Sequence, residues 1–419
     1  MAERLKEEKV FKDPVHKYIY VQDQTVWDLI NTREFQRLRR IRQLGTSFFT
    51  FHGAEHSRFS HSLGVYEVTR KIISQFERNE FPDWPREERL LSLCAALLHD
   101  IGHGPYSHSV EQAFNTHHED WTCRMVLGHT EVNEVLRRVS DTFPGQVAEV
   151  ISKTYREEIV VSLVSSQFDA DRMDYLLRDA YFTGVNYGTF DLERILRVIR
   201  PYKGRLVVKE SGMHAVEDYL MSRYQMYWQV YFHPVTRSSE ILLRKIFQRA
   251  KELRKGGFAF GFLIEPLPAL FEGRLTVSEY LHLDESFMQM VFMQWTSEQD
   301  RILADLCKRF LNRGLFKYIK LDNIEPAVMK RLKQVLQRKG IDPNYYLEID
   351  FPTDLPYDVY QPGKADEILP IYLLSEHNEL SEISSKSEIV RSISGIHRGQ
   401  YHLYYPDELR DDIAKEILC

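Results

Sequence analysis

Apolar residues are spaced differently in two parts of the chain, and the spacing predicts a long helical region followed by a shorter mixed one. Between residues 25 and 315, apolar positions recur mainly at helical spacing, which indicates helices with one buried face. Beyond residue 316, short strand-like runs alternate with helical segments. We therefore predict a mainly α fold with a smaller α+β C-terminal region at 316–419, preceded by an N-terminal arm or small hairpin at 1–24.

Helical and strand-like patterns can be assigned to definite stretches. Helical patterns cover residues 60–76, 90–98, 132–139, 146–151, 160–164, 169–179, 213–231, 239–253, 284–311, 327–339 and 408–418. Strand-like patterns cover residues 316–321, 345–351, 369–374 and 401–405. We expect Pro234 to end the helix that precedes it, and the Ser-rich stretch 381–394 predicts a loop with a short helix.

The apolar run at 90–98 ends abruptly in His99-Asp100, and two glycines and a proline follow closely. A buried helix that ends in polar residues and then breaks presents those residues at a fixed point. Neighbouring residues inside a helix diverge by about 100°, whereas a helix end can direct both side chains toward one point. The pair is therefore a candidate for metal binding.

His61 and Asp171, which lie on other predicted helices, complete a set of two imidazoles and two carboxylates. Such a set suits Mn, Fe, Ni, Zn or Mg and leaves coordination positions for a water and a phosphate oxygen. A His-Asp pair alone is a weak signal, but eight of the 16 histidines lie between residues 52 and 118. This density favours a metallohydrolase.

Two further polar stretches have alternative interpretations. One face of a predicted helix carries Asp171, Tyr175 and Asp179. This face is either solvated or part of a site, and the sequence favours neither interpretation. Five arginines lie between residues 33 and 42. Composition favours a solvated helix face for this run, and the alternative is an anion pocket.

Composition and charge limit the classes of function. At a formal net charge of -6, the whole molecule is not a nucleic-acid binder by charge, and a polyanion would need a local basic pocket. Four cysteines without close pairs fit a reducing compartment and argue against a disulfide framework or a zinc ribbon. The N-terminus has no apolar core of a signal peptide, and no run approaches the roughly 20 residues of a membrane helix. We therefore expect a cytoplasmic protein without membrane contact.

Three motifs in fixed order carry a family resemblance. They are Arg58-Phe59-Ser60-His61-Ser62-Leu63-Gly64-Val65, His99-Asp100-Ile101-Gly102-His103-Gly104-Pro105-Tyr106-Ser107-His108 and Asp171-Arg172-Met173-Asp174-Tyr175-Leu176-Leu177-Arg178-Asp179. The chain resembles the HD-domain phosphohydrolases, and more narrowly the deoxynucleoside triphosphate triphosphohydrolases that include the vertebrate SAM-and-HD-domain enzyme and its bacterial relatives. The resemblance runs from about residue 10 to about residue 233, and it also includes Gln36-Arg37-Leu38-Arg39, Gln43-Leu44 and Arg223. Since no SAM domain precedes it, we expect the bacterial relatives to be closer and residues 25–315 to form a helical HD domain.

The resemblance implies a metal-dependent enzyme that converts a dNTP and water to a deoxynucleoside and triphosphate. Metal-held water or hydroxide would attack the α-phosphorus, because coordination lowers the pKa of water toward neutrality. The implied metal ligands are His61, His99, Asp100 and Asp171. The implied proton donor to the leaving 5′-oxygen is His108. His118 and Glu111 are its implied supporting relay, and His103 also lines the site. Glu111 stands where the vertebrate enzyme has Asp, which keeps a carboxylate but changes its reach.

The same resemblance implies the contacts to the substrate. The residues that match phosphate contacts are Arg58, Arg172, Tyr175 and Arg223, with Arg172 in place of a Lys of the vertebrate enzyme. Gln43 and Asp179 match contacts to the sugar 3′-OH. Leu44 and Tyr231 match residues that crowd the 2′ position and would exclude ribonucleotides, although the sequence alone favours core packing for both.

The vertebrate enzyme is activated by nucleotides bound between the subunits of a tetramer. The resemblance therefore implies a homotetramer and a nucleotide activator, a dNTP or GTP. The matching positions of the regulatory site are Val10, Gln36 and Arg39. Lys12 and Asn31 stand where that enzyme has an Asn and the Asp that reads guanine, so the base preference stays open.

Two other functions compete with this one. The first is an HD-type nucleotidase or phosphodiesterase that acts on other nucleotides. The second is a non-catalytic nucleotide sensor or nucleic-acid binder with a vestigial site. The polar helix at 171–179, together with Arg223 and Tyr231, favours a triphosphate substrate over the first. The net acidity and the complete ligand set count against the second.

Overall fold

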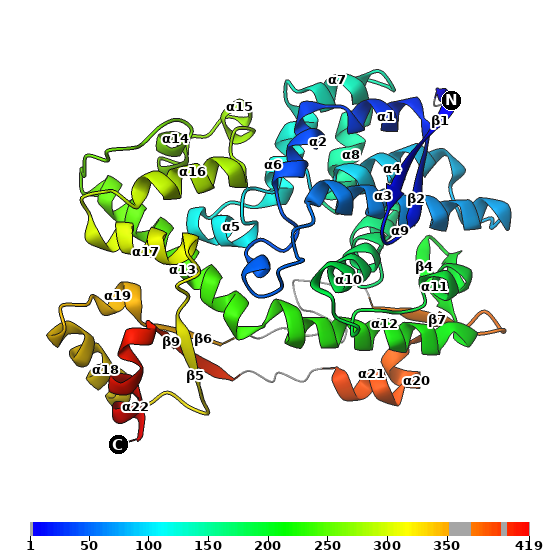
Figure 1. Cartoon of the computed structure of the whole chain (residues 1–419). Helices are drawn as coiled ribbons and strands as arrows, with labels where there is room; N and C mark the ends of the chain where they lie inside the picture. The colour runs from blue at the N-terminus through cyan, green and yellow to red at the C-terminus, as the bar shows by residue number, and fades with distance from the viewer. Residues whose placement is uncertain (1–2, 352–369, 395–399, 419) are drawn as a thin grey trace.

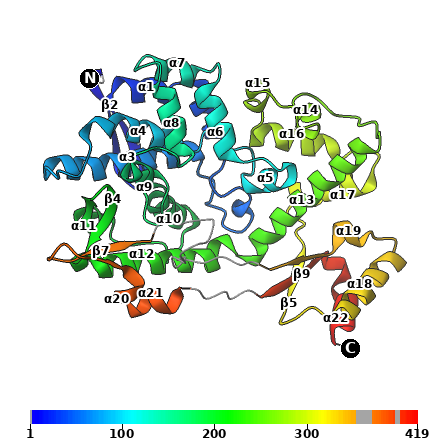
Figure 2. The ribbon, with the colours of Figure 1, turned by 180° about the vertical axis from the view of Figure 1, so that it is seen from behind.

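The computed structural model describes residues 3–351, 370–394 and 400–418, and it confirms a mainly α fold with small sheets. A body of packed helices fills the upper part of Figure 1, with the N-terminal hairpin at one edge. A three-stranded sheet and its helices lie below, beside the C-terminus. Seen from behind, the run of α12 (Met213–Met226) and α13 (Pro234–Lys255) again lies between these two parts (Figure 2).

The N-terminal segment forms an antiparallel hairpin of β1 (Arg4–Asp13) and β2 (Lys17–Asp23). Ile19 and Val21 on β2 are buried and alternate with partly exposed neighbours, which is the pattern of a strand with one packed face. β2 packs on α3 and on α1 (Gln24–Ile30). The hairpin therefore belongs to the helical body and is not a free arm.

Three helices form the centre of this body, and α3 packs against both of the others. They are α3 (Arg58–Arg78), α4 (Arg89–Leu98) and α10 (Ala170–Thr183). Every side chain of α4 from residue 91 to 98 is buried, which confirms the predicted helix and explains why its sequence is apolar apart from Ser92, whose hydroxyl donates to Glu88 O. Asp169 caps α10 by accepting the N–H of Arg172, so the polar helix begins at a defined residue.

Further helices surround this centre and follow it along the chain. Their bounds are α2 (Arg33–Arg37), α5 (His108–Phe114), α6 (His118–Leu127), α7 (Glu131–Arg137), α8 (Phe143–Ile151), α9 (Glu158–Val164), α11 (Leu192–Val198), α14 (Leu267–Phe271), α15 (Val277–Tyr280), α16 (Glu285–Trp295) and α17 (Arg301–Leu311). The helical pattern at 284–311 corresponds to two helices, because Asp300 caps a new one. Pro234 does not simply end a helix. It occupies the first position of α13, where its missing N–H costs nothing.

The described residues after 316 contribute to two sheets. One has the order β5-β9-β6, and the other has the order β3-β4-β7-β8. The strands are β3 (Ile199–Tyr202), β4 (Arg205–Lys209), β5 (Lys317–Leu321), β6 (Glu348–Asp350), β7 (Tyr372–Leu374), β8 (Leu380–Glu382) and β9 (Tyr401–Tyr405). The remaining helices are α18 (Pro326–Arg338), α19 (Pro343–Tyr346), α20 (Ile383–Lys386), α21 (Glu388–Ile393) and α22 (Arg410–Leu418).

This arrangement differs from the predicted tail in three respects. β7 pairs in parallel with β4, so the C-terminal region shares a sheet with the preceding one. Part of the strand predicted at 345–351 is the short helix α19, and the Ser-rich stretch holds β8 and two short helices. Residue 369, the first of another predicted strand, lies outside the described residues.

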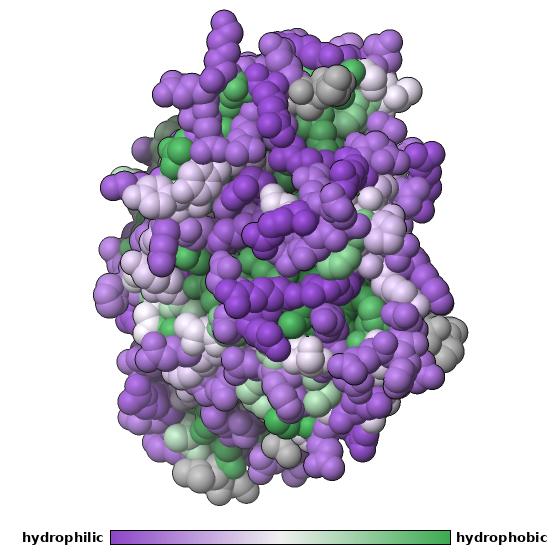
Figure 3. Space-filling view, turned by 90° about the vertical axis from the view of Figure 1, so that its right-hand side faces the viewer, coloured by the Kyte–Doolittle hydropathy of each residue, from purple (hydrophilic) through white to green (hydrophobic). Residues whose placement is uncertain are grey.

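Hydrophilic side chains cover most of the face shown in Figure 3, and apolar ones appear there in small, separate areas. The buried apolar side chains form a continuous cluster that extends from the hairpin to the C-terminal helices. Among the described residues, no helix combines the length and the apolar character needed to span a membrane.

Candidate functional site

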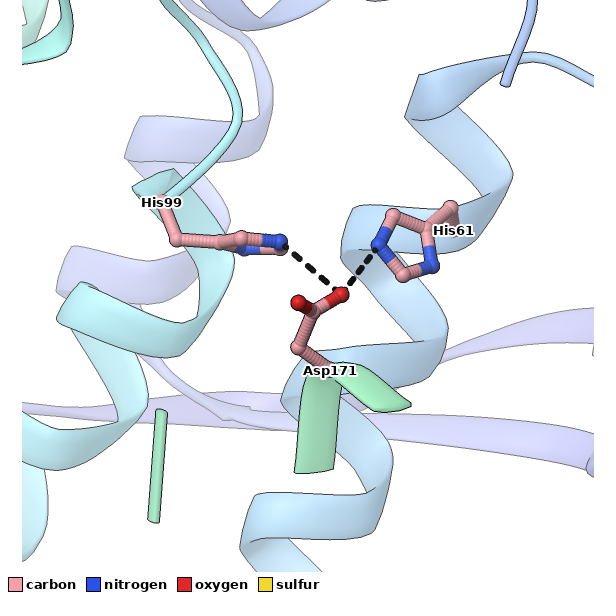
Figure 4. A group of neighbouring side chains, drawn as sticks. All are labelled: His61, His99 and Asp171. Carbon is pink, nitrogen blue, oxygen red and sulfur yellow. Dashed lines mark ion pairs between the residues drawn. The ribbon is translucent and has the colours of Figure 1, made fainter. Parts of the chain in front are cut away.

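Three of the predicted metal ligands come together where the three central helices begin or end (Figure 4). His61 lies in the first turn of α3, His99 follows the last residue of α4, and Asp171 lies in the first turn of α10. Asp171 Oδ1 is 3.0 Å from His61 Nε2 and 3.6 Å from His99 Nε2. Figure 4 shows both imidazole rings pointing toward this carboxylate.

The donor atoms of this group fit a divalent metal ion. His61 Nε2 and His99 Nε2 are buried and hydrogen-bond to no residue that the structure describes. The Nδ1 atoms bond elsewhere, to Asp174 Oδ2 at 2.8 Å and to Ala96 O at 2.9 Å, so each ring directs a lone pair at Nε2 into the site. Burial opposes a charge on His61, but the carboxylates of Asp171 and Asp174 raise its pKa to about 10, so a metal ion bound at Nε2 would take the place of a proton there. Two imidazoles and a carboxylate within 4.8 Å form a set that transition metals accept.

Asp100, the fourth predicted ligand, lies beside this group. Its Oδ1 is 3.4 Å from His99 Nε2 and 3.3 Å from His103 Nε2. Its Oδ2 lies 3.8 Å from His61 Nε2 and accepts a hydrogen bond from Arg58 Nη1. Burial would raise the pKa of Asp100, but Arg58, His99 and His103 hold that pKa well below its usual range. The carboxylate therefore stays ionised, as metal binding requires.

A strained loop leads from the end of α4 to α5. Tyr106 and Ser107 have φ values of 56° and 48°, a conformation that residues with a Cβ atom rarely adopt. Arg58 Nη2 donates to Ser107 Oγ at 2.8 Å, and a Cβ on Gly102 would lie only 2.1 Å from His118 O. The loop is thus held against α6 in one conformation, which is typical of a functional site.

The basic run at residues 33–42 is mainly structural, so neither of its two interpretations describes it fully. Arg37 is fully buried and donates to Leu283 O at 2.7 Å and to His103 O at 2.8 Å. Three other arginines of the run form ion pairs, Arg33 with Glu34, Arg40 with Asp284 and Arg42 with Glu285. The run therefore joins the site loop to the start of α16.

His103, Glu111 and His118 form a second cluster beside the candidate ligands. Glu111 Oε1 bonds His118 Nδ1 at 2.9 Å and lies 3.5 Å from His103 Nδ1, and the two imidazole rings stack with centroids 3.8 Å apart. Burial, together with the charges of Arg58 and His118, holds the pKa of His103 well below its usual range. His108, the predicted proton donor, begins α5, but its side chain lies outside the described residues.

A cavity of about 580 Å³ adjoins both clusters, and its volume lies in the range of about 300–1,000 Å³ that is usual for small-molecule sites. The predicted site residues on its wall are Gln43, Leu44, Arg58, Asp100, His103, His118, Asp171, Tyr175, Asp179 and Tyr231. Gln43 Oε1 is buried and accepts no hydrogen bond from any described residue. It is therefore an acceptor available to a ligand.

Asp179, which lies further along α10, is held in place by two partners from other parts of the chain. His56 Nε2 bonds its Oδ1 at 2.7 Å, and Tyr231 Oη donates to its Oδ2 at 2.9 Å. Tyr231 lies in a π-helical turn, Tyr227–Tyr231, that follows α12, and such turns are frequent at functional sites. Asp179 is 1% exposed, so the solvated interpretation of its helix face is wrong. His56 was not among the predicted site residues, and the local density of histidines was the only signal for it.

Two of the predicted phosphate-binding arginines, Arg172 and Arg223, do not line the cavity, but their charges affect residues that do. Arg223 Nε and Nη1 and Arg172 Nε are buried and have no hydrogen-bond partner among the described residues. Burial raises the pKa of Tyr175, and the positive charges of Arg223 and Arg172 oppose that rise. The Arg223 guanidinium also lies 5.6 Å from the centre of the Tyr227 ring, which lines the cavity.

The predicted regulatory positions lie outside this cavity. Arg39 Nε donates to Gln36 Oε1 at 2.8 Å, and the guanidinium lies 3.6 Å from the centre of the Phe59 ring. Val10 lies on β1 and is 49% exposed. Gln36 and Arg39 are thus neighbours, and a regulatory role for the three positions stays a prediction.

The chain is similar to proteins of known family. The HD domain matches residues 58–179, and the HD associated region matches residues 190–258. The uncharacterized protein YwfO of Bacillus subtilis is 58% identical over 413 residues, which are 98% of this chain and 95% of that protein. The deoxynucleoside triphosphate triphosphohydrolase SAMHD1 homolog of Dictyostelium discoideum is 26% identical over 75% of this chain and 60% of its own length.

A solved structure agrees with these matches. A phosphohydrolase from Bacteroides thetaiotaomicron has a TM-score of 0.83 and 28% sequence identity, and the match covers 95% of this chain and 100% of that one. All three motifs that carried the resemblance fall within the HD match at 58–179. The matches, the helical fold and the histidine and aspartate groups suited to a metal agree that this chain belongs to the HD-domain phosphohydrolase family.

Proposed function

We propose that the protein is a metal-dependent dNTP triphosphohydrolase, which converts a dNTP and water to a deoxynucleoside and triphosphate. One observation carries the proposal. Two of the candidate metal ligands, Asp100 and Asp171, line the same cavity as an oriented carboxylate, Asp179, and the buried guanidinium of Arg223 lies 5.6 Å from the ring of Tyr227 on the wall of that cavity. The name of the Dictyostelium relative, a dNTP triphosphohydrolase, supports the same substrate class.

The metal and the arginines would together bind the phosphates of the substrate. A divalent ion, Mn, Mg, Fe, Ni or Zn, held by the four predicted ligands would supply Lewis-acid chemistry and activate water. Two nitrogen atoms of Arg223 and one of Arg172 have no hydrogen-bond partner in the described part of the chain, and guanidinium groups bind phosphate through such donors. Arg58 already bonds Asp100 and Ser107, so in our proposal it orients these two groups and also contacts the phosphates.

Polar side chains on the wall of the cavity would select the deoxyribose. Asp179 makes two bonds that hold its carboxylate still, and each oxygen can accept one more, which suits a sugar 3′-OH. Gln43 supplies the further acceptor noted above. Leu44 and Tyr231 would occupy the space that a ribose 2′-OH requires, and this steric exclusion would restrict turnover to deoxyribonucleotides.

The second cluster, His103, Glu111 and His118, would take part in proton transfer together with His108. Cleavage between the α-phosphorus and the 5′-oxygen leaves an alkoxide that needs a proton, and we assign this donation to His108. Glu111 bonds both the N–H and the Nδ1 of His118, so His118 would exchange protons through Nε2. His103 stacks on His118 and would keep that ring in place.

Regulation is part of the proposal. A nucleotide activator, a dNTP or GTP, would bind at Val10, Gln36 and Arg39 between the subunits of a homotetramer. The resemblance supports this assignment, and so does the adjacency of Gln36 and Arg39.

Product identification tests the proposed reaction. The purified protein is incubated with each dNTP and Mn or Mg, and the products are separated by ion exchange. Intact triphosphate and deoxynucleoside are expected. Orthophosphate or pyrophosphate as the first product would point instead to an HD-type nucleotidase, and binding without turnover would point to a sensor. His99→Ala should abolish turnover, whereas His282→Ala, at an exposed histidine outside the cavity, should not.

A further inference from the structure

His61 is held from behind by a second carboxylate. Its Nδ1 bonds Asp174 Oδ2 at 2.8 Å, and both side chains are completely buried. Because the proton then lies on Nδ1, the lone pair lies on Nε2, the atom 3.0 Å from Asp171 Oδ1. A carboxylate in this position fixes the tautomer and the ring orientation of a metal-binding histidine.

Asp174 is itself held by two residues that are far apart in the sequence. Arg178, one turn further along α10, donates to Oδ2 through Nε at 2.8 Å and to Oδ1 through Nη2 at 2.9 Å. His16 Nε2 bonds Oδ1 at 2.6 Å. Each carboxylate oxygen therefore makes two bonds, and the carboxylate cannot rotate without breaking at least one of them.

His16 belongs to the turn of the N-terminal hairpin, and the turn is organised around Asp13. Asp13 Oδ1 accepts the N–H groups of Val15 and His16, both at 2.9 Å, which is an arrangement that stabilises a tight turn. Asp13 Oδ2 accepts from Arg178 Nη1 at 2.8 Å. The hairpin turn thus contacts the support of His61 twice, once directly through His16 and once through Arg178.

Helix α3 leaves room for this network at Gly64, one turn after His61. A Cβ atom there would lie 1.9 Å from Asp174 Oδ1 and 2.4 Å from Arg178 Nη2. A glycine inside a helix costs about 1 kcal/mol relative to alanine, and the close approach of the ion pair accounts for its presence. The same face of α10 carries the ligand Asp171 and, three and seven residues later, the two supporting residues.

We propose that Asp174 is a positioning residue for the metal ligand His61, and that the turn of the N-terminal hairpin sets the metal affinity of the site through His16. The inference rests on the metal site proposed above. None of Asp13, His16, Asp174 and Arg178 lines the 580 Å³ cavity, so these residues act through His61 and not on the substrate. Separation of the hairpin from α10 would remove one of the four bonds on Asp174 and loosen the ligand.

Metal affinity of the full-length protein tests this inference without reference to turnover. Protein stripped of metal is titrated with Mn²⁺, and free Mn²⁺ is measured by its electron paramagnetic resonance signal. His16→Leu replaces the donor with an apolar side chain of similar size. Because His16 bonds the partner of His61 and not His61 itself, Mn²⁺ binding should weaken by up to about 10-fold, the lower end of the 10–100-fold effect of losing a direct partner. His16→Gln restores an N–H donor and should regain most of the affinity. His129→Leu, at an exposed histidine away from the site, is the matched control and should bind as the wild type does.

The outcomes separate this inference from the proposed function. If the wild type binds Mn²⁺ and a folded His16→Leu variant binds it equally well, the hairpin inference is wrong and the metal site stands. If the wild type binds none of Mn²⁺, Fe²⁺, Ni²⁺, Zn²⁺ and Mg²⁺, the proposed metal site fails and this inference fails with it. Should His16→Leu not fold, as judged by circular dichroism, Asp174→Asn tests the same link at constant size, and an unchanged Mn²⁺ affinity there would also overturn it.

Discussion

Replacement of Arg223 by methionine should lower the activity of the protein without lowering its stability. Arg223 is 7% exposed, and its Nε and Nη1 have no hydrogen-bond partner among the described residues. In the proposed function these N–H groups bind the phosphates of the substrate. Methionine keeps most of the apolar stem and removes the charge together with both donors, so the substitution tests whether the guanidinium is kept for a ligand.

The expected magnitudes follow from this geometry. A hydrogen bond to a charged group contributes about 1.5–3 kcal/mol, so two contribute about 3–6 kcal/mol, and at about 1.4 kcal/mol per tenfold kcat/KM should fall about 10²- to 10⁴-fold. In the protein without substrate, two buried unpaired donors cost about 1–3 kcal/mol each. The contact of Arg223 with Tyr227 returns about 0.5–2 kcal/mol. The free energy of unfolding of Arg223→Met should therefore be unchanged or higher.

The assay combines kcat/KM for a dNTP with urea unfolding of the same preparations. Leu220→Ala is the calibrating variant, because Leu220 is fully buried on the same helix and its truncation should cost about 2–5 kcal/mol of stability. The reasoning is refuted if Arg223→Met keeps its kcat/KM. It is also refuted if this variant loses as much stability as Leu220→Ala.

Three further predictions use other parts of the molecule. Gly102→Ala would place a Cβ 2.1 Å from His118 O, a backbone atom, so the free energy of unfolding in urea should fall by about 1–3 kcal/mol; wild-type stability would show that α6 gives way easily. Burial tends to raise the pKa of Asp300, but Arg249 and the N–H of Leu303 outweigh it and lower that pKa. The stabilisation is then complete above the unfolded value of about 3.9 and is lost as pH falls through the lower folded-state value. Asp300→Asn should therefore destabilise the protein near neutral pH but not in strong acid, and an equal loss at both would exclude the charge as the cause. Removal of divalent metal by a chelator and dialysis should abolish turnover and lower the melting temperature, with recovery on adding Mn²⁺ or Mg²⁺; full activity of metal-free protein would contradict the metal assignment.

The polar end of α4 shows how much of the site could be predicted from the sequence. The largely apolar run at 90–98, its polar end and the following breaks are local features, and they correctly place His99 at the end of a buried helix. The chemistry of the donor set, and then the likeness of three ordered motifs to one family, indicated which other residues meet there, and His61 and Asp171 do converge on His99. Helical period alone did not show that Asp179 is buried, because the same period fits a solvated face and a packed one.

The contacts that support the site could not be predicted in this way. Arg37 was expected in a basic run, but it is buried among carbonyl oxygens of residues 103 and 283. His56 reaches Asp179 across 123 residues of chain, and β7 joins a strand formed more than 160 residues earlier. Such contacts depend on how whole elements pack, and no local pattern in the sequence records them.

The sequence by itself thus determined the mainly helical class, the three motifs and the kinds of donor atom available for a metal. These depend on local periodicity, on helix ends and on the chemistry of single side chains. The tertiary structure alone decided which donors face one another, and which residues hold them. His16 and Asp174 meet only because β2 and α10 both pack on α3, and that packing is a property of the assembled core.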